Sequence, residues 1–336
     1  MSNRMVSLDG ARGIAAFCIL LFHLSIEHFS MLYLAVDFFF VLSGFVLANN
    51  IDRIKSITQF KTFIILRYFR IMPMLLSVML FYLIYDLALI LYSYVYARPF
   101  PELIVTEPLT IIFSLTFLQV FYQPALLVVW PVWSLSAEWI TNLFFPIMTK
   151  QGRNRSILGT ILGSLVVCVS SYLDFEPLIH IGRALLGFTL GYAVSRIQRF
   201  YLSKSISLLI IFTLTIPYLM IAPKLGNYQA LLSGPFFAFV IVHLSRIETG
   251  AKTQMYCSFL GKYSYGFYLW HFPVMMTTGN LLSRVYWFQN LNANVGLISH
   301  GFLTAMVTLL ATFLSIRIFE VPIRTWAQGR FNPITQ

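Results

Sequence analysis

Long apolar segments dominate the sequence, and most are long enough to cross a lipid bilayer as a helix. A spanning helix needs about 20 apolar residues. Only 10% of the 336 residues are charged, against about 25% in soluble domains. We therefore predict an all-α polytopic membrane protein. Its apolar windows lie at 8–28, 31–50, 72–96, 108–122, 130–148, 156–173, 178–195, 205–222, 228–245, 262–282 and 294–319.

The basic residues predict how these segments are oriented, because cytoplasmic loops of membrane proteins are rich in Lys and Arg. With the N-terminus in the cytoplasm, 19 of the 23 basic residues fall on one side, and only Arg98, Lys224 and Arg284 fall on the other. The net charge of +11 thus belongs to cytoplasmic loops and not to a nucleic-acid surface.

The same rule requires 108–148 to cross the membrane only once, with a re-entrant or outer segment near 108–130. We predict about ten transmembrane helices around a central cavity. The protein would be a multi-pass membrane protein, in contact with membrane lipids and with both termini cytoplasmic.

Several other classes of protein are excluded. The first apolar run is not a secretory signal, because it is too long, contains Arg12 and lacks a cleavage site. The three scattered cysteines make neither a disulfide framework nor a metal site, so no metal is expected. We interpret residues 1–336 as a single membrane-embedded domain without an added C-terminal domain.

The segment RGIAAFCILLFH (12–23) has Arg12 at one end and His23 at the other. Eleven residues of helix make three turns plus about 20°, so the two side chains share a face about 16 Å apart. Ionisable groups at membrane depth indicate function by default. The alternative is that Arg12 reaches the lipid headgroups and His23 makes one interhelical hydrogen bond.

The segment VDFFFVLSGF (36–45) follows His23 after a very short predicted turn. The turn predicts an antiparallel helix pair with Asp37 at the depth of His23. A carboxylate beside an imidazole fixes its tautomer and raises its basicity, as acid–base chemistry requires. A purely structural Asp–His hydrogen bond is the alternative.

The segment WSLSAEW (133–139) places Glu138 near the middle of its window. A carboxylate there needs a partner, and Arg12, Arg183 or a substrate hydroxyl is suitable. Trp133 either anchors the helix at the membrane interface or stacks on a sugar ring.

Arg67 and Arg70 lie one helical turn apart on a cytoplasmic segment before the window at 72–96. Arginines at this spacing face the same way and can bind phosphate oxygens. The alternatives are topology-determining charge and contact with anionic lipid.

In YSYGFYLWHFPV (263–274), Tyr265, Tyr268 and His271 follow one another at steps of three. They form either an aromatic packing stripe or one wall of a polar cavity. The spacing of Tyr268 and His271 favours the cavity.

Taken together, these segments resemble the membrane acyltransferase-3 family, bacterial enzymes that O-acetylate surface polysaccharides. The resemblance runs from about residue 8 to 325, and the chain resembles the stand-alone members that acetylate O-antigen sugars. Seven motifs occur in the family's order: LDGARGIAAFCILLFH, VDFFFVLSGFVLA, RYFRIMP, PVWSLSAEW, GRALLGFTLGY, YSYGFYLWHFPV and FEVPIR.

The resemblance implies transfer of an acetyl group from cytoplasmic acetyl-CoA to a hydroxyl of a lipid-linked saccharide outside. Acetyl-CoA would be a substrate, with no tightly bound cofactor. The family's paired motifs match Arg12 with His23, Arg67 with Arg70, and Ser134 to Glu138. Residues that we expect to bind the acceptor or to line the cavity are Trp133, Ser136, Arg183, Tyr268 and His271.

The expected roles follow from this assignment. Arg67 and Arg70 would hold the CoA phosphates, and the pantetheine arm would pass Arg12 toward His23, oriented by Asp37. His23 would act either as general base or as an acyl carrier. Glu138, the third residue expected to take part in catalysis, would help Trp133 to position the acceptor. The rival functions are a proton-coupled transporter, or the same fold with another acyl donor or a non-saccharide acceptor.

Overall fold

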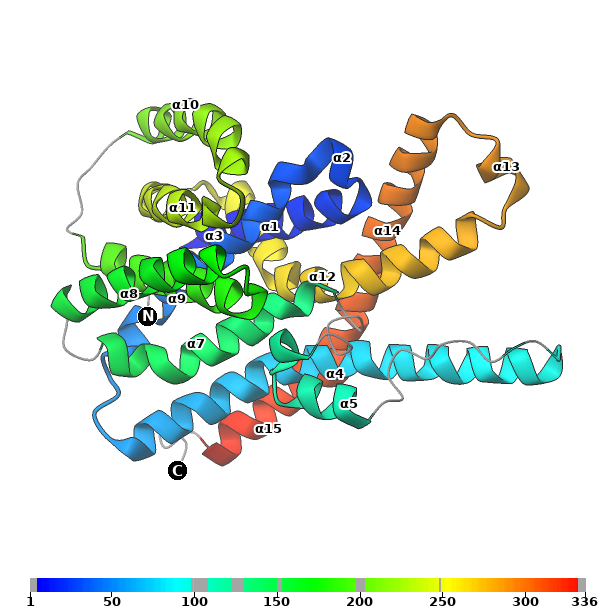
Figure 1. Cartoon of the computed structure of the whole chain (residues 1–336), viewed down its shortest axis with the longest axis horizontal. Helices are drawn as coiled ribbons and strands as arrows, with labels where there is room; N and C mark the ends of the chain where they lie inside the picture. The colour runs from blue at the N-terminus through cyan, green and yellow to red at the C-terminus, as the bar shows by residue number, and fades with distance from the viewer. Residues whose placement is uncertain are drawn as a thin grey trace. The chain divides into compact units, whose positions relative to one another are not determined.

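The computed structural model describes residues 5–97, 99, 108–122, 130–149, 153–197, 203–247 and 249–331. Within these ranges every regular element is helical and no strand occurs, so the all-α prediction is confirmed for them. The first helices are α1 Val6–Leu24, α2 Ile26–Phe29, η1 Ser30–Leu34, α3 Ala35–Ile51, α4 Ile57–Val95, α5 Pro108–Leu115, η2 Gln119–Phe121, η3 Trp130–Val132 and α7 Trp133–Thr149 (Figure 1). The remaining helices are α8 Arg153–Tyr172, α9 Glu176–Ser195, α10 Lys204–Ile221, η4 Ala222–Gln229, α11 Ala230–Leu244, α12 Ala251–Leu282, α13 Tyr286–Gln289, α14 Ala293–Ser315, η5 Ile316–Glu320 and α15 Val321–Phe331.

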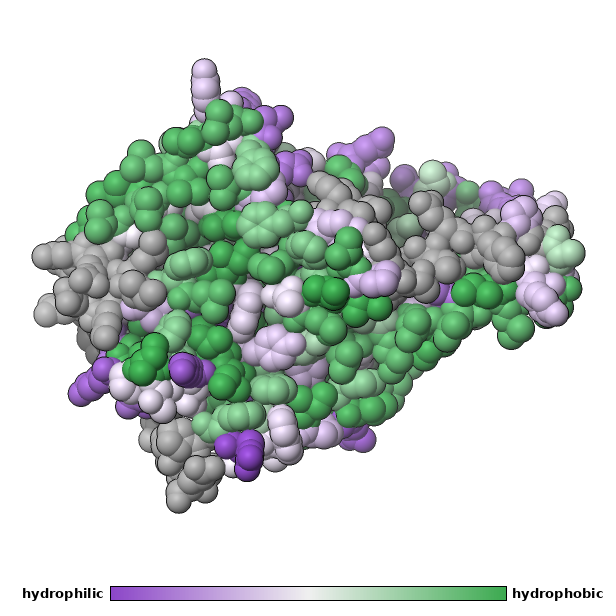
Figure 2. All heavy atoms as spheres, turned by 60° about the horizontal axis from the view of Figure 1, so that its bottom comes forward, coloured by the Kyte–Doolittle hydropathy of each residue, from purple (hydrophilic) through white to green (hydrophobic). Residues whose placement is uncertain are grey.

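Six helical stretches in the described ranges are long and apolar enough to cross a membrane. The surface seen in Figure 2 is largely hydrophobic, as expected for helices that face lipid. These findings support a polytopic membrane protein, while the number of ten helices and the central cavity stay predictions. The six stretches are Val6–Leu24, Ile26–Ile51, Ile57–Val95, Glu176–Ser195, Ser205–Leu244 and Ala293–Phe331.

Two connections differ from the predictions. The prediction of a very short turn before Asp37 is wrong, because α2 and η1 form a helical connection between α1 and α3. Helix α4 begins at Ile57 and not near residue 72, and it continues through Pro73. Its 39 residues span about 58 Å, roughly twice the hydrocarbon thickness of a bilayer. Arg67 and Arg70 therefore lie on the helix itself and not on a segment before it.

The chain forms two compact units, which we describe separately. Unit 1 comprises Met1–Phe60 and Ala137–Ser264, and unit 2 comprises Lys61–Ser136 and Tyr265–Gln336.

The centre of unit 1 is a close contact between α3 and α9. A Cβ atom on Gly44 would lie 2.0 Å from the Phe188 carbonyl oxygen, and one on Gly191 would lie 2.0 Å from the Val41 carbonyl oxygen. Only glycine permits this approach, which is typical of helix packing in membranes. Asp37 contacts Arg183 and Asp52 contacts Arg196, so α3 and α9 run parallel, as the distribution of basic residues predicts for the windows at 31–50 and 178–195.

Helices α1, α8 and α11 surround this pair. Gly163 and Gly182 bring α8 against α9 in the antiparallel sense. The Ser7 hydroxyl donates to the Leu244 carbonyl at 2.6 Å and so ties the start of α1 to the end of α11. The apolar core between α1, α3 and α11 consists of Leu8, Ala15, Phe38, Val41, Leu42, Ala238 and Ile241.

Unit 2 is built on α4, α12 and α14. The Tyr265 hydroxyl donates to the Ile71 carbonyl at 2.7 Å, which joins α12 to α4. The Trp270 indole donates to the Ser315 hydroxyl at 2.9 Å, which joins α12 to α14. Helix α14 turns small and hydroxyl-bearing residues inward and apolar residues outward, the pattern of a helix in lipid. Its buried residues are Gly301, Thr304, Thr308, Thr312 and Ser315.

Candidate functional site

The predicted site residues fall into both units. Unit 1 holds Arg12, His23, Asp37, Glu138 and Arg183. The residues in unit 2 are Arg67, Arg70, Trp133, Ser136, Tyr268 and His271. Convergence of the two sets on one reaction centre stays a prediction, and each set is described within its own unit.

Helix α1 carries Arg12 and His23 without a break. Arg12 and His23 therefore lie on one continuous helix, as the prediction that their side chains share a face requires. Arg12 is half-buried and lies 3.9 Å from Asp9, one turn earlier. His23 is half-buried in the last turn, where its ring meets Phe22 edge-on at 4.8 Å between ring centres.

Asp37 has different partners from the one predicted. Its Oδ1 accepts from Arg183 Nε at 3.0 Å, and its Oδ2 accepts from the Ser233 hydroxyl at 2.5 Å. The Arg183 guanidinium also lies 5.6 Å from the centre of the Tyr33 ring. We call Asp37, Arg183 and Ser233 the Asp37 cluster. It joins the first turn of α3 to α9 and α11.

The prediction that His23 is the direct partner of Asp37 is thus wrong. A guanidinium keeps its charge even when buried, and it must then be paired and hydrogen-bonded. A charge-assisted bond to Arg183 is stronger than one to a neutral imidazole. The sequence identified Arg183 as a charge inside a window but gave no sign of its partner, 146 positions away.

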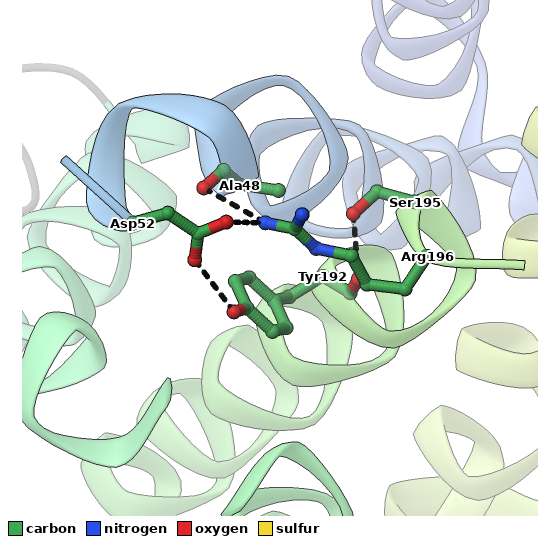
Figure 3. Close-up of polar contacts among 5 residues, drawn as sticks. All are labelled: Ala48, Asp52, Tyr192, Ser195 and Arg196. Carbon is green, nitrogen blue, oxygen red and sulfur yellow. Dashed lines mark hydrogen bonds and ion pairs between the residues drawn. The ribbon is translucent and has the colours of Figure 1, made fainter. Parts of the chain in front are cut away.

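The opposite ends of α3 and α9 carry a second cluster, shown in Figure 3. Asp52 is paired with Arg196 and accepts a hydrogen bond from the Tyr192 hydroxyl at 2.7 Å. The Arg196 guanidinium lies over the Tyr192 ring, 5.0 Å from its centre, and also reaches the Ala48 carbonyl. We call Asp52, Tyr192 and Arg196 the Asp52 cluster.

The WSLSAEW segment is held by hydrogen bonds on both sides of the unit boundary. In unit 2, the Ser136 hydroxyl donates to Gln119 Oε1 at 2.5 Å, so η2 packs on the start of α7. In unit 1, the Glu138 backbone carbonyl accepts from Asn142 Nδ2 at 2.8 Å. Glu138 and Trp133 are half-buried at the N-terminal end of α7.

Tyr268 and His271 are buried on α12, and Tyr268 reaches the WSLSAEW segment. The Tyr268 hydroxyl lies 2.7 Å from the Ser134 hydroxyl and donates to the Pro131 carbonyl at 2.9 Å. His271 Nδ1 lies 2.6 Å from the Tyr268 carbonyl, and its side chain is fully buried. Two motifs that the sequence offered separately therefore meet in unit 2.

Arg67 and Arg70 are one turn apart on α4, as predicted, but they differ in exposure. Arg67 is buried and Arg70 is exposed. The residues between them fix this part of α4: the Tyr68 hydroxyl donates to the Leu115 carbonyl at 3.0 Å, and Phe69 packs edge-on against Trp326.

Some buried polar residues were not predicted to take part in the site, among them Ser233 of the Asp37 cluster, Gln119 and the three that follow. Asp86 on α4 is fully buried. The sequence could have indicated it, because it is the only carboxylate in the window at 72–96. Thr141 and Asn142 follow Glu138 by one turn and are also buried. Among the described residues, no group of three or more His, Cys, Asp or Glu side chains is arranged to hold a metal ion.

Comparison with known proteins gives a consistent result. The profile of an acyltransferase domain matches residues 5–317. The chain is 25% identical to the peptidoglycan O-acetyltransferase OatA of Listeria monocytogenes, over 95% of this chain and 55% of that protein. It is 23% identical to YrhL of Bacillus subtilis, whose name proposes the same activity, over 97% of this chain and 56% of that protein.

The chain thus spans little more than half the length of these relatives. No solved structure matches it. Because the acyltransferase profile covers nearly all of the sequence, the chain belongs to the acyltransferase-3 family.

Proposed function

We propose that this protein transfers an acetyl group from cytoplasmic acetyl-CoA to a hydroxyl of a surface saccharide on the outer side of a bacterial inner membrane. One observation carries the proposal: α1 is an unbroken apolar helix with Arg12 in its first half and His23 in its last turn. A donor entering from one side and an acceptor from the other would then meet on one helix face. The distribution of basic residues favours a topology with both termini in the cytoplasm, and the parallel run of α3 and α9 agrees with it.

The donor side is assigned to arginines. Arg67 and Arg70 are suited to the phosphates of CoA, because guanidinium groups bind phosphate oxygens in a forked geometry. The exposed Arg70 would meet the phosphates first. Arg12 would contact the donor beyond them, on the way to His23.

The reaction is assigned to His23. As a general base, its imidazole accepts the proton of the acceptor hydroxyl while that oxygen attacks the thioester carbonyl. The carbon–sulfur bond breaks, and the proton passes to the leaving CoA sulfur. In the alternative, the imidazole itself takes the acetyl group and gives it to the hydroxyl in a second step. Asp37 is assigned a positioning role through Arg183 and Ser233.

The acceptor is assigned to the saccharide class, either lipid-linked O-antigen or another exported glycan. The names of both relatives favour peptidoglycan as a further candidate. The proposed topology places the N-terminal end of α7 toward the outside. This end carries Trp133, Ser136 and Glu138. An aromatic face and a carboxylate are suited to a sugar ring and its hydroxyls.

The test uses membrane vesicles that carry the cell's own glycan and receive labelled acetyl-CoA on the cytoplasmic side. Wild-type protein should label the glycan, and mass spectrometry should identify the acyl group and its position. His23→Ala should abolish labelling. His28→Ala is the matched control, because His28 is exposed on α2 and bonded to the Ser25 hydroxyl.

Labelling that persists in His23→Ala would contradict the assignment of His23. An unchanged affinity for acetyl-CoA after Arg67→Ala with Arg70→Ala would contradict the donor site. Proton transport without any acetyl transfer by the wild type would favour the transporter and reject the proposed function.

A further inference from the structure

Helix α7 buries two polar atoms that have no hydrogen-bond partner within the described part of the chain. They are the Thr141 hydroxyl oxygen and Asn142 Oδ1. Thr141 is 2% exposed and Asn142 is fully buried. Both belong to unit 1 and lie within the apolar window at 130–148, where water is scarce.

The helix places both residues on the face that carries Glu138. Thr141 and Asn142 follow Glu138 by three and four positions, so the three side chains are neighbours. Asn142 Nδ2 donates to the Glu138 carbonyl at 2.8 Å, which fixes the amide and leaves Oδ1 available. One turn further, Phe145 meets Phe188 of α9 edge-on at 5.3 Å between ring centres, so this face is turned toward α9.

Buried threonine hydroxyls differ in this respect within the described residues: those of Thr308 and Thr312 on α14 also have no partner, whereas others bond a backbone carbonyl. A threonine in a helix can donate to the carbonyl four residues earlier, as Thr189 does to Leu185 and Thr278 does to Val274 at 2.8 Å in each case. Thr141 does not use this bond. Buried polar atoms without partners destabilise a fold, and they are rare in native structures unless a ligand or water completes them.

We propose that Thr141 and Asn142 bind hydroxyl groups of the saccharide acceptor beside Glu138. A sugar hydroxyl can donate to Asn142 Oδ1, and a neighbouring hydroxyl can accept from the Thr141 hydroxyl while the Glu138 carboxylate accepts from either. Glu138 is the partly exposed member of the three and offers the entry to the two buried ones. The inference rests on the proposed function and names the residues that recognise its acceptor.

The variants Thr141→Val and Asn142→Leu remove the polar atoms. Thr141→Val keeps the side-chain volume, whereas Asn142→Leu keeps the branched shape and is somewhat larger. Each should lower labelling of the glycan in vesicles by about tenfold, the effect of one lost hydrogen bond to a ligand. The affinity of the purified full chain for acetyl-CoA should stay unchanged. Thr141→Ser retains the hydroxyl and should label glycan at the wild-type rate.

Thermal unfolding of the acceptor-free protein separates recognition from a structural role. Thr141→Val should unfold at or above the wild-type temperature, because it removes an unsatisfied buried atom. Asn142→Leu also loses the bond from Nδ2 to the Glu138 carbonyl, so the unfolding test uses Thr141→Val. Thr189→Val is the matched control and should unfold at a lower temperature, because its hydroxyl is bonded to Leu185 and to Leu186.

Three results would overturn the inference: full labelling by both variants, an equal loss of labelling and of acetyl-CoA affinity, or a melting temperature of Thr141→Val lowered as in Thr189→Val. The last result would indicate a bound structural water. If the wild type itself transfers no acetyl group to glycan, the proposed function fails, and this outcome is distinct from a failure of the variants alone.

Discussion

The α3–α9 pair carries an ion pair at each end, and the two ends differ in their surroundings. In the Asp37 cluster the paired side chains are only 3% and 5% exposed, for Asp37 and Arg183 respectively. In the Asp52 cluster they are 37% and 38% exposed, for Asp52 and Arg196. Fifteen residues of α3, or about 22 Å of helix, separate the two carboxylates.

This difference in exposure indicates a different role for each ion pair. A buried pair holds its helices only while both charges and their hydrogen bonds are complete, since an unpaired charge inside is strongly destabilising. It therefore specifies one arrangement of α3, α9 and α11. An exposed pair is solvated and contributes little to stability. The Asp52 cluster is therefore expected to contribute much less to the arrangement of the helices than the Asp37 cluster.

Removal of the buried carboxylate should give the largest effect. Asp37→Leu leaves the Arg183 guanidinium without its counterion and should lower the free energy of unfolding by about 3–5 kcal/mol. Unfolding in mixed micelles under increasing sodium dodecyl sulfate would measure this. Asp37→Leu combined with Arg183→Leu should recover most of the loss. It should also recover glycan labelling if the role of Asp37 is positional. Recovered stability without labelling would assign the Asp37–Arg183 pair a part in the reaction beyond holding the helices together.

Removal of the neutral partner should have an intermediate effect. Ser233→Ala deletes the hydroxyl that bonds Asp37 Oδ2 and should cost about 1.5–3 kcal/mol, the range for hydrogen bonds to charged groups. The same unfolding assay applies. Ser245→Ala, whose hydroxyl bonds the nearby Val242 carbonyl at the end of α11, is the control and should cost less. Equal losses would show that Ser233 does not support the ion pair.

A methyl group between the two clusters should separate the helices that the ion pairs connect. Gly191→Ala places a Cβ against the Val41 carbonyl and should destabilise the protein by about 1–3 kcal/mol. Gly329→Ala meets nothing within 4 Å and should be neutral or stabilising, because alanine favours helix. A tolerated Gly191→Ala would mean that α3 and α9 are not closely packed.

The smallest effect is expected at the exposed end. Asp52→Asn should lower the free energy of unfolding by about 1 kcal/mol or less, and 0.5 M salt should reduce even this difference. The loss from Asp37→Leu should be much less sensitive to salt, because salt does not screen a buried pair well. A large, salt-independent loss from Asp52→Asn would remove the contrast between the clusters.

Many features of the fold could be predicted from local properties of the sequence. Apolar windows predicted helices, and the positions of basic residues predicted that α3 and α9 run in the same direction. The spacing from Arg12 to His23 required only a continuous helix, which α1 provides. These predictions succeed because hydropathy, charge and helical period depend on neighbouring residues.

The tertiary structure alone decided which distant side chains meet. The turn before Asp37 became helical, and Asp37 found Arg183 and Ser233, 146 and 196 positions away, in place of the nearer His23. The unsatisfied atoms of Thr141 and Asn142 depend likewise on what packs against one face of α7. The sequence shows which charges must be paired inside a membrane. The partner of each charge depends on which helices pack closely together. For α3 and α9, this close packing depends on glycines from both helices.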